Sequence, residues 1–340
     1  MPSQPSQLPV QVRMLQLITA GWLGQAVSAA AELGLADALA SGPRSVRDLA
    51  EATEAHAPSL YRLLRACADI GLFDEHDDQV FALTELGETL RDDSPVSLRN
   101  FAVWTGLPAE RYAWAGLAGA VRTGQPAFPE VLGKSVWDYM QDHPDVLTVF
   151  DKAMTELSRQ IIGPVVAAYG FGGFGTVVDV GGGRGALLAA VLAANPEARG
   201  ILYDRPEVIA RAGGPLREAG VDDRAQLIGG DFFDGVPRGG DAYVLSNIIH
   251  DWDDELSRRI LAHCRDALPG DGRVLLVEAV VPDRPRPTPT VSLMDLDMLA
   301  VAGGRQRTAA EFEALLRTAG LRLERIVPGG HCSVVEASRA

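Results

Sequence analysis

The chain has 340 residues, 47% of them hydrophobic and 22% charged, which is the balance of an ordinary globular protein with room for two domains. The formal net charge of −14 opposes phosphate backbones and anionic membranes, so it argues against nucleic acid or membrane as the main partner. The three cysteines are scattered and lack the spacing of a metal site. No apolar run reaches about 18 residues, and the N-terminus does not resemble a signal peptide. These features predict a cytoplasmic protein.

The first part of the chain is predicted to be helical. Residues 1–10 are polar and proline-rich, which indicates a loose arm. Residues 12–39 repeat apolar side chains at helical spacing and are apolar enough to favour packing on a second subunit. Ser45 is the expected N-cap of a short helix, a second helix follows Pro58, and residues 73–83 form a hairpin. Helix, turn, helix and hairpin in this order predict a winged-helix arrangement.

A stretch of aromatic-rich helices comes next. Residues 84–87 are expected to begin a helix, and residues 95–165 carry helical patterns interrupted by prolines. The glycine-rich segment 169–173 is the expected joint before the last domain. We therefore divide the chain into an arm with a winged-helix domain (1–98), linking helices (99–168) and an α/β domain (169–340).

From residue 176 onward, strand patterns alternate with helix patterns. The expected strands are 176–181, 200–204, 225–229, 241–249, 273–280, 321–327 and 332–336. The expected helices are 184–194, 206–219, 254–268 and 308–319. This alternation predicts a Rossmann-like, mostly parallel seven-stranded sheet with helices on both faces. The proline-rich run 282–289 is interpreted as a surface loop.

The first of these strands runs into a glycine loop, residues 181–185. Glycines allow a sharp turn and a close approach of the backbone to a ligand, so a nucleotide-like cofactor is indicated. A purely structural tight turn is the alternative. Gly181, Gly183 and Ala186 also satisfy the looser dinucleotide pattern G-x-G-x-x-A, so NAD stays open on the loop alone.

Three acids near strand ends favour S-adenosylmethionine over NAD. Asp179 precedes the glycines, where a carboxylate suits a cofactor with positive charge and repels a pyrophosphate. Asp204 ends the second strand, where an acid can bind ribose hydroxyls, although it could instead be a turn residue. Asp231 ends the third strand and could accept from an exocyclic amine, or could cap a turn.

His250 follows the fourth strand at the edge where ligands bind in open α/β sheets. Histidine is the natural base near neutral pH for a hydroxyl that must lose its proton, while a structural histidine is the alternative. Glu278 ends the apolar fifth strand, and burying it without a partner would be costly. We expect it to orient His250, with a salt bridge or cap as the alternative, and we expect Asp251 to cap the next helix.

Five motifs in order resemble the class I O-methyltransferases of the plant caffeate and flavonoid type and their bacterial natural-product relatives. They are VVDVGGGRG (177–185), YDRPEVI (203–209), GGDFF (229–233), HDW (250–252) and GGRQRTAAEF (303–312). Each motif is weak alone, but their order and spacing match over nearly the whole chain. The resemblance implies a homodimer built through the N-terminal domain. It also implies that the linking helices contribute to the acceptor pocket.

The resemblance also implies which residues bind S-adenosylmethionine. The glycines lie against its methionine part, Asp204 binds ribose, and Asp231 with Phe232 contacts adenine. The cofactor-binding set is Asp179, Gly181, Gly183, Asp204, Arg205, Asp231, Phe232 and Ser246. Ser246 stands where plant members often carry a lysine.

The catalytic set implied by the resemblance is His250, Glu278 and Gln306. His250 matches the general base and Glu278 one of its two flanking acids, while the second acid falls at Gln306, an amide. The acceptor pocket is lined by Phe150, Met154, Asn247 and Met298, for which ordinary core packing is the alternative. The loop 298–304 is one residue shorter than the plant pattern, so plant specificity residues are not carried across.

The expected reaction is an SN2 methyl transfer in which His250 takes a proton from a hydroxyl of a small aromatic secondary metabolite, and we expect that hydroxyl to be phenolic. Three rival functions stay open. They are an NAD-dependent dehydrogenase, a winged-helix DNA-binding regulator, which the acidic charge opposes, and a family member that methylates nitrogen, carbon or a non-phenolic hydroxyl. No metal site is expected.

Overall fold

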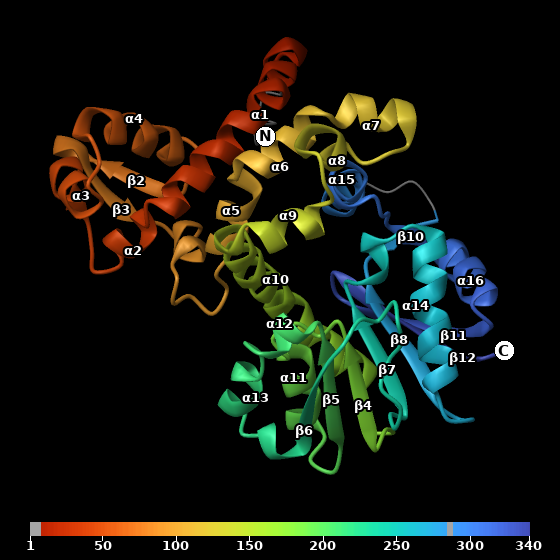
Figure 1. The fold of residues 1–340 in the computed structure, drawn as a ribbon. Helices are drawn as coiled ribbons and strands as arrows, with labels where there is room; N and C mark the ends of the chain where they lie inside the picture. Colours follow the sequence, from red (N-terminus) through yellow and green to blue (C-terminus); the bar gives the residue numbers. More distant parts are fainter. Residues whose placement is uncertain (1–7, 284–287) are drawn as a thin grey trace, which may run out of the picture. The chain divides into compact units, whose positions relative to one another are not determined.

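A computed structural model describes residues 8–283 and 288–340, and Figure 1 shows its fold. The chain divides into two compact units, which are described separately. The first combines Met1–Arg111 with Pro144–Glu156, and the second combines Tyr112–His143 with Leu157–Ala340. The predicted arm at 1–10 and loop at 282–289 fall largely outside the described residues.

The first unit contains the expected winged helix. Its helices are α1 (Val10–Glu32), α2 (Leu35–Leu39), α3 (Val46–Ala52), α4 (Ala57–Ala68) and α5 (Arg99–Gly106), and its strands are β1 (Arg44–Ser45), β2 (Phe73–His76) and β3 (Val80–Leu83). The Ser45 side chain accepts a hydrogen bond from the backbone N–H of Asp48 and caps α3, as predicted. The expected helix over 12–39 is interrupted because Gly34 takes a left-handed conformation, with φ of 65°, between α1 and α2.

Leucine, phenylalanine and alanine side chains from these helices and the hairpin form one core, which includes Leu35, Leu49, Leu64, Phe73 and Phe81. Residues 84–87 do not begin an α-helix as expected. Only a short 3₁₀ turn, Gly87–Leu90, forms here. The backbone carbonyl of Leu72 lies 2.2 Å from where a Cβ on Gly87 would stand, so this turn is tightly packed against the hairpin.

The second unit is built on the predicted sheet. Its strands are β4 (Thr176–Val180), β5 (Arg199–Asp204), β6 (Ala225–Gly229), β7 (Ala242–Ser246), β8 (Arg273–Glu278), β11 (Leu321–Gly329) and β12 (Cys332–Arg339). They form one seven-stranded sheet in the order β11-β12-β8-β7-β4-β5-β6. Strands β4 to β8 pair in parallel, and β12 joins β8 antiparallel. The predicted α/β class is confirmed.

Alternate residues of the strands face two separate cores, as a buried parallel sheet requires. On one face Val178, Tyr243 and Leu276 pack with helices α14 (Asp254–Ala267) and α16 (Ala309–Thr318). On the other face Leu202 and Val244 pack with α11 (Ala186–Ala194), α13 (Gly214–Glu218) and the end of α10 (Pro144–Tyr169). Helices therefore cover both faces (Figure 1).

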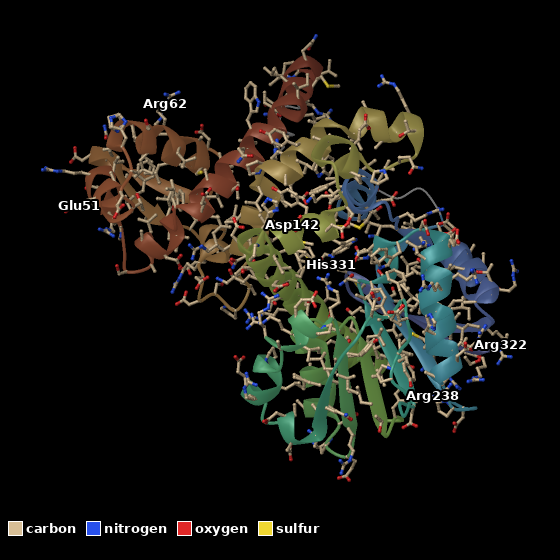
Figure 2. All side chains as sticks on the ribbon, in the orientation of Figure 1. Glu51, Arg62, Asp142, Arg238, Arg322 and His331 are labelled. Carbon is tan, nitrogen blue, oxygen red and sulfur yellow. The ribbon has the colours of Figure 1, made fainter. Side chains whose placement is uncertain are left out.

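Besides α12 (Pro206–Ile209), which is described below, five further α-helices and one short ladder belong to the described chain. The helices are α6 (Pro108–Ala115), α7 (Leu117–Thr123), α8 (Ala127–Leu132), α9 (Val136–Asp142) and α15 (Pro289–Asp297). The short strands β9 (Val280–Val281) and β10 (Arg307–Thr308) pair in parallel. Charged side chains such as Glu51 and Arg62 in the first unit, and Arg238 and Arg322 in the second, are exposed (Figure 2).

Two predicted boundaries in the second unit are wrong. The strand expected over 241–249 ends at Ser246, because Asn247 takes a left-handed conformation with φ of 52°. The helix expected over 206–219 is split into α12 (Pro206–Ile209) and α13, because Gly213 turns left-handed and Pro215 follows. Within residues 8–283 and 288–340, no helix combines the length and apolar character needed to cross a bilayer.

Candidate functional site

The predicted site residues of the second unit gather where its parallel strands end. The order of the sheet reverses between β4 and β7, because successive strands continue outward from β4 through β5 and β6, and from β7 through β8. Such a reversal opens a crevice beyond the carboxyl ends of the strands. Val180, Asp204, Ser246 and Glu278 end four of these strands, so the glycine loop and His250 share one edge of the sheet.

The glycine loop is shaped by its neighbours. Gly181 has φ of 70°, and its N–H donates to the carbonyl of Tyr203 at 2.8 Å. A Cβ at this position would stand 2.6 Å from Cδ1 of Ile248 and 3.6 Å from Cε1 of Phe232. Glycine is therefore required at 181 both by conformation and by space. Ile248, which sequence reasoning missed, forms one wall of the loop.

Asp204 ties the glycine loop to β5. One carboxylate oxygen accepts from the N–H of Gly183 at 2.8 Å, and the other accepts from the N–H of Arg205 at 2.7 Å. Each carboxylate oxygen has more than one lone pair, so these bonds leave Asp204 able to accept from ribose hydroxyls. The side chain of Arg205 contacts Glu207 instead, with 3.2 Å between Nε and Oε1.

Asp179 lies behind the loop. It is 1% exposed, and its carboxylate stands 2.6 Å from where a Cβ on Gly182 would be. Neither carboxylate oxygen has a hydrogen-bond partner among the residues that the structure describes. Burial, helped by the charge of Asp204, raises the pKa of Asp179 to about 7. A buried acid without a partner fits a cationic ligand on the loop and would oppose a pyrophosphate.

Aromatic rings border the loop beyond β6. Phe232 makes edge contacts with Phe233 and Trp252, at centroid distances of 4.9 Å and 6.1 Å. Asp231 is exposed and accepts from the N–H of Phe233 at 2.7 Å, so it forms a turn and keeps acceptor capacity. This arrangement can hold a flat heterocycle with an exocyclic amine.

Ser246 and Asn247 mark the end of β7. Ser246 is half-buried at the carboxyl end of the strand, beside the glycine loop. Asn247 directs its side-chain oxygen toward Cys332, with 3.8 Å between Oδ1 and Sγ. The geometry therefore places the Asn247 amide on the β12 side of this strand end.

His250 is held between two carboxylates. Its Nδ1 lies 2.7 Å from Oε2 of Glu278, and its Nε2 lies 3.3 Å from Oδ1 of Asp251. Burial opposes the charged ring, but the two acids prevail and raise the pKa of His250 well above 6.5. The Glu278 contact was predicted. The Asp251 contact was not, and the expected cap role of Asp251 is wrong because Asp253 caps α14 by accepting from Leu256.

Glu278 also organises the backbone around His250. It is fully buried, and its Oε1 accepts from the N–H groups of Ile248, Ile249 and His250 at 3.2, 2.8 and 3.4 Å. A single carboxylate therefore caps the turn that follows β7 and orients the imidazole.

The segment after α15 supplies the remaining predicted residues of this unit. Gln306 is 4% exposed, and its side-chain amide has no hydrogen-bond partner among the described residues. Its backbone N–H donates to Asp295 at 2.7 Å. Met298 is 8% exposed in the wide turn Met298–Ala302. Gln306 thus has unused donors and acceptors, whereas Met298 is largely packed.

Two further polar residues near His250 were missed by sequence reasoning. Asp297 accepts from the indole N–H of Trp114 at 2.7 Å, and burial raises its pKa to about 6. Arg307 is 1% exposed and bonds to the backbone beside His250. The motif GGRQRTAAEF drew attention to Gln306, but the sequence alone gave no indication that the side chain of Arg307 is buried against the backbone beside His250. Phe150 and Met154 lie on α10 within the first unit.

Comparison with known proteins gives two family matches. Residues 114–322 match an O-methyltransferase domain, and residues 15–93 match an O-methyltransferase dimerisation domain. Together the two matches span most of the chain, and they divide it into an N-terminal and a catalytic part.

Individual relatives agree with these matches. The chain is 44% identical to a phenazine O-methyltransferase of Lysobacter antibioticus, over 97% of this chain and 96% of that protein. It is also similar to a crystallised O-methyltransferase of neocarzinostatin biosynthesis, with a TM-score of 0.80 and 37% identity over 93% of this chain and 96% of that one. That enzyme was crystallised with S-adenosylmethionine and 2-hydroxy-5-methyl naphthoic acid.

The relatives do not all methylate oxygen. An 8-amino-8-demethylriboflavin N,N-dimethyltransferase of Streptomyces davaonensis is 37% identical over 89% of this chain and 87% of that protein. The comparisons therefore support methylation of small natural products more strongly than they support one kind of acceptor atom.

Proposed function

The chain belongs to the O-methyltransferase family, which uses S-adenosylmethionine, and we propose that its acceptor is a phenolic hydroxyl of a small aromatic metabolite with His250 as general base. The observation that carries this proposal is the buried pair of His250 and Glu278, 2.7 Å apart at the strand end beside the glycine loop. A base fixed at that edge suits a reaction in which a hydroxyl must lose its proton.

The two ring nitrogens of His250 have different tasks in this proposal. Nδ1 keeps its proton, and its N–H donates a hydrogen bond to Glu278, which fixes the tautomer and the direction of the ring. Nε2 faces the weaker contact with Asp251 and is the atom that accepts the proton of the acceptor hydroxyl. After the transfer, Glu278 and Asp251 stabilise the imidazolium. The base contributes roughly 10²–10⁴-fold to the rate.

The raised pKa of His250 has a consequence for activity. A protonated ring cannot accept a proton, so the active fraction grows as pH rises through the pKa of His250. We therefore expect turnover to increase with pH on the alkaline side of 6.5.

The donor is held by the glycine loop and its acids. Gly181 and Gly183 form the surface for its methionine part, Asp204 the ribose contact, and Asp231 with Phe232 the adenine contact. When bound, S-adenosylmethionine supplies an electrophilic methyl group on a cationic sulfur. The buried carboxylate of Asp179 supports that positive charge from behind the loop.

A nitrogen acceptor is the second candidate, because a relative of 37% identity is an N,N-dimethyltransferase. An amine that is neutral at working pH already has a free lone pair and needs a base less. Replacing His250 would then lower turnover only slightly. The same variant therefore separates the two acceptor classes.

The test uses a panel of phenols and aromatic amines that includes 1,4-dihydroxy-2-naphthoic acid, with mass spectrometry to detect products that gain one methyl group. With a phenolic substrate of the panel, His250→Ala should lower kcat by roughly 10²–10⁴-fold. Its affinity for S-adenosylhomocysteine, measured by calorimetry, should stay within about twofold of wild type. Unchanged turnover of phenols would contradict the base assignment.

We also propose that the chain forms a homodimer through its N-terminal unit. Helix α1 exposes large apolar side chains, with Trp22 76%, Leu17 70% and Ile18 68% exposed. Such a face on a helix of a domain that matches a dimerisation family favours a second copy as its cover. Light scattering after gel filtration should give a dimer mass for wild type and a lower mass for Trp22→Asp.

A further inference from the structure

The segment that carries His250, residues 247–252, has little regular structure of its own. We call it the base loop. It begins with the left-handed Asn247 and contains one 3₁₀ turn, Ile249–Asp251, before α14 starts at Asp254. A single turn makes few internal hydrogen bonds, so the position of the imidazole depends on contacts from outside the loop.

One end of the base loop is held by an anion. The three N–H groups of residues 248–250 point to Oε1 of Glu278, at 2.8 to 3.4 Å. These are the donors that a short helical turn leaves without partners at its start. Glu278 therefore acts on the backbone as well as on the ring.

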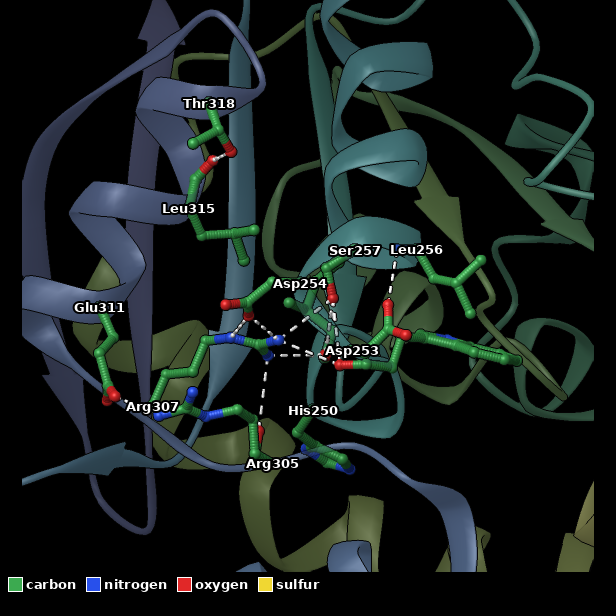
Figure 3. A network of polar contacts seen from close by, with 12 residues as sticks. His250, Asp253, Asp254, Leu256, Ser257, Arg305, Arg307, Glu311, Leu315 and Thr318 are labelled. Atoms are coloured by element: carbon green, nitrogen blue, oxygen red, sulfur yellow. Dashed lines mark hydrogen bonds and ion pairs between the residues drawn. The ribbon is translucent and has the colours of Figure 1, made fainter. Parts of the chain in front are cut away.

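The other end is held by a cation, as Figure 3 shows. The guanidinium of Arg307 donates to the carbonyl of Ile249 at 2.9 Å and to that of Trp252 at 3.0 Å. It also donates to Oδ1 of Asp254, at 2.7 and 3.1 Å. These carbonyls precede and follow His250, so the guanidinium spans the backbone of the residue that carries the base.

The segment just before Arg307 adds two constraints. The N–H of Arg305 donates to the carbonyl of His250 itself at 2.8 Å. The same carbonyl lies 1.9 Å from where a Cβ on Gly304 would stand, so a side chain there would displace the loop. Residues 304–307 therefore lie directly against the base loop.

Glu278 and Arg307 are placed by one piece of backbone. Arg307 pairs with Val280 in the short parallel ladder of β9 and β10. Glu278 ends β8, two residues before Val280. The anion and the cation are therefore fixed relative to each other. Glu278 lies 28 residues and Arg307 lies 57 residues after His250 in the sequence, so local sequence patterns do not predict this arrangement.

We propose that Arg307 is a positioning residue for the base, holding the base loop from the carbonyl side while Glu278 holds it from the N–H side. The inference rests on the proposed role of His250. Arg307 does not touch the ring and acts through the backbone of residues 249 and 252. A planar guanidinium reaches two carbonyls and a carboxylate at once, whereas the single ammonium of a lysine does not, so Arg307→Lys should loosen the loop while keeping the charge.

The chain offers a matched control in Arg224. Its guanidinium also donates to three backbone carbonyls, those of Leu192, Asn195 and Ala198, at 2.8, 3.0 and 2.8 Å. These carbonyls lie at the end of α11 and just beyond it, away from the base loop. Arg224→Lys therefore removes a similar set of bonds without moving His250.

The first test is a double-mutant cycle of His250→Ala and Arg307→Lys, with turnover of a phenolic panel substrate expressed per site that binds S-adenosylhomocysteine. This normalisation counts folded enzyme only. We expect Arg307→Lys alone to lower kcat by roughly 10- to 100-fold, since a displacement of about 1 Å can cost 10²-fold. In the His250→Ala background the same change should cost less than about twofold, because the residue through which Arg307 acts is gone. Arg224→Lys should stay within about twofold in both backgrounds.

The outcomes separate this inference from the proposed function. If His250→Ala lowers kcat but Arg307→Lys does not, or if the two losses multiply, Arg307 has only a structural role and the inference is overturned while the base stands. If His250→Ala has no effect, the base assignment fails, and the inference fails with it.

A second measurement needs no acceptor. The ring resonances of His250, assigned by their loss in His250→Ala, are titrated by NMR in the full chain. Arg307→Lys should lower the measured pKa of His250 toward 6.5, because a looser loop weakens the contact with Glu278. The pKa should be unchanged in Arg224→Lys. An unchanged titration in Arg307→Lys would overturn the inference.

Discussion

The glycine loop and the base loop lie at the same edge of the sheet but are built in different ways. The glycine loop is shaped by its own residues, since left-handed Gly181, Gly183 and Gly185 follow one another within five positions. The base loop is shaped by residues far away in sequence, Glu278 and Arg307, whose opposite charges meet its two ends. In the proposed function, the first is a local motif that binds the methyl donor, and the second is assembled from distant residues and positions a proton acceptor.

This difference predicts how each loop fails. A change in the glycine loop should weaken donor binding and leave the chemistry of the bound complex nearly intact. A change in the contacts of the base loop should leave donor binding intact and slow the chemistry. The following variants test that separation, beginning with the largest expected effect.

Glu278→Gln should have the largest effect on the base loop. The amide oxygen can still accept from Ile249, but the amide nitrogen then faces Nδ1 of His250 and donates to it. The ring proton must move to Nε2, which occupies the nitrogen that should accept the acceptor's proton. We expect kcat to fall by roughly 10³-fold, measured in single turnover.

Glu336→Gln is the control for that variant. Glu336 is also a buried strand glutamate, but it contacts Arg273 and Arg325 at 3.1 and 2.6 Å. Its loss should lower thermal stability and leave kcat within about twofold of wild type. Equal losses of kcat in both variants would show that Glu278 acts only through stability.

Gly183→Ala should break the other loop. A Cβ there would meet no other segment of the described chain within 4 Å, so it does not touch the base loop, but alanine would have to adopt a left-handed conformation with φ of 56°. Strain of about 1–3 kcal/mol would weaken binding of S-adenosylhomocysteine by roughly ten- to hundredfold. Calorimetry measures this loss. Gly173→Ala should bind normally, because a Cβ there would meet no other segment of the described chain within 4 Å and φ lies outside the left-handed region.

Asp251→Asn should shift the pH dependence. The Asp251 carboxylate raises the pKa of His250, so its removal lowers that pKa. Because turnover requires the neutral ring, the rising limb of the pH–rate profile should move to lower pH. A profile that stays in place or moves to higher pH would contradict the contact at Nε2.

Asp231→Asn should have the smallest effect. Asp231 is exposed, and an amide oxygen can still accept from the N–H of Phe233. Loss of one hydrogen bond to the donor is worth about 0.5–1.5 kcal/mol, or roughly two- to tenfold in donor affinity. The pH–rate profile should not move, since Asp231 is proposed to contact the donor and does not contact His250.

The same difference explains what the sequence could predict. Strands β4, β5, β7 and β8 were predictable because each is a short apolar run buried on both faces. The glycine loop was predictable because its turn is formed by consecutive glycines. The end of β7 was predicted three residues too late, because the left-handed turn at Asn247 is stabilised by Glu278, a contact that local patterns do not contain. Arg307 was missed for the same reason, since its partners lie more than 50 residues earlier.

Acids posed a related difficulty. Asp251 was interpreted as a helix cap because aspartates favour that position, but Asp253 takes the cap and leaves Asp251 for His250. Which of several neighbouring acids reaches the ring depends on the path of one turn of backbone. The spacing in the sequence did not determine that path.

The most direct test of the account is the single-turnover rate of methyl transfer to a phenolic acceptor as a function of pH, in wild type and in His250→Ala. The account predicts a wild-type rate that rises through a pKa above 6.5. For His250→Ala it predicts a rate roughly 10²–10⁴-fold lower that follows only the ionisation of the acceptor. Equal rates and identical profiles in the two proteins would contradict it.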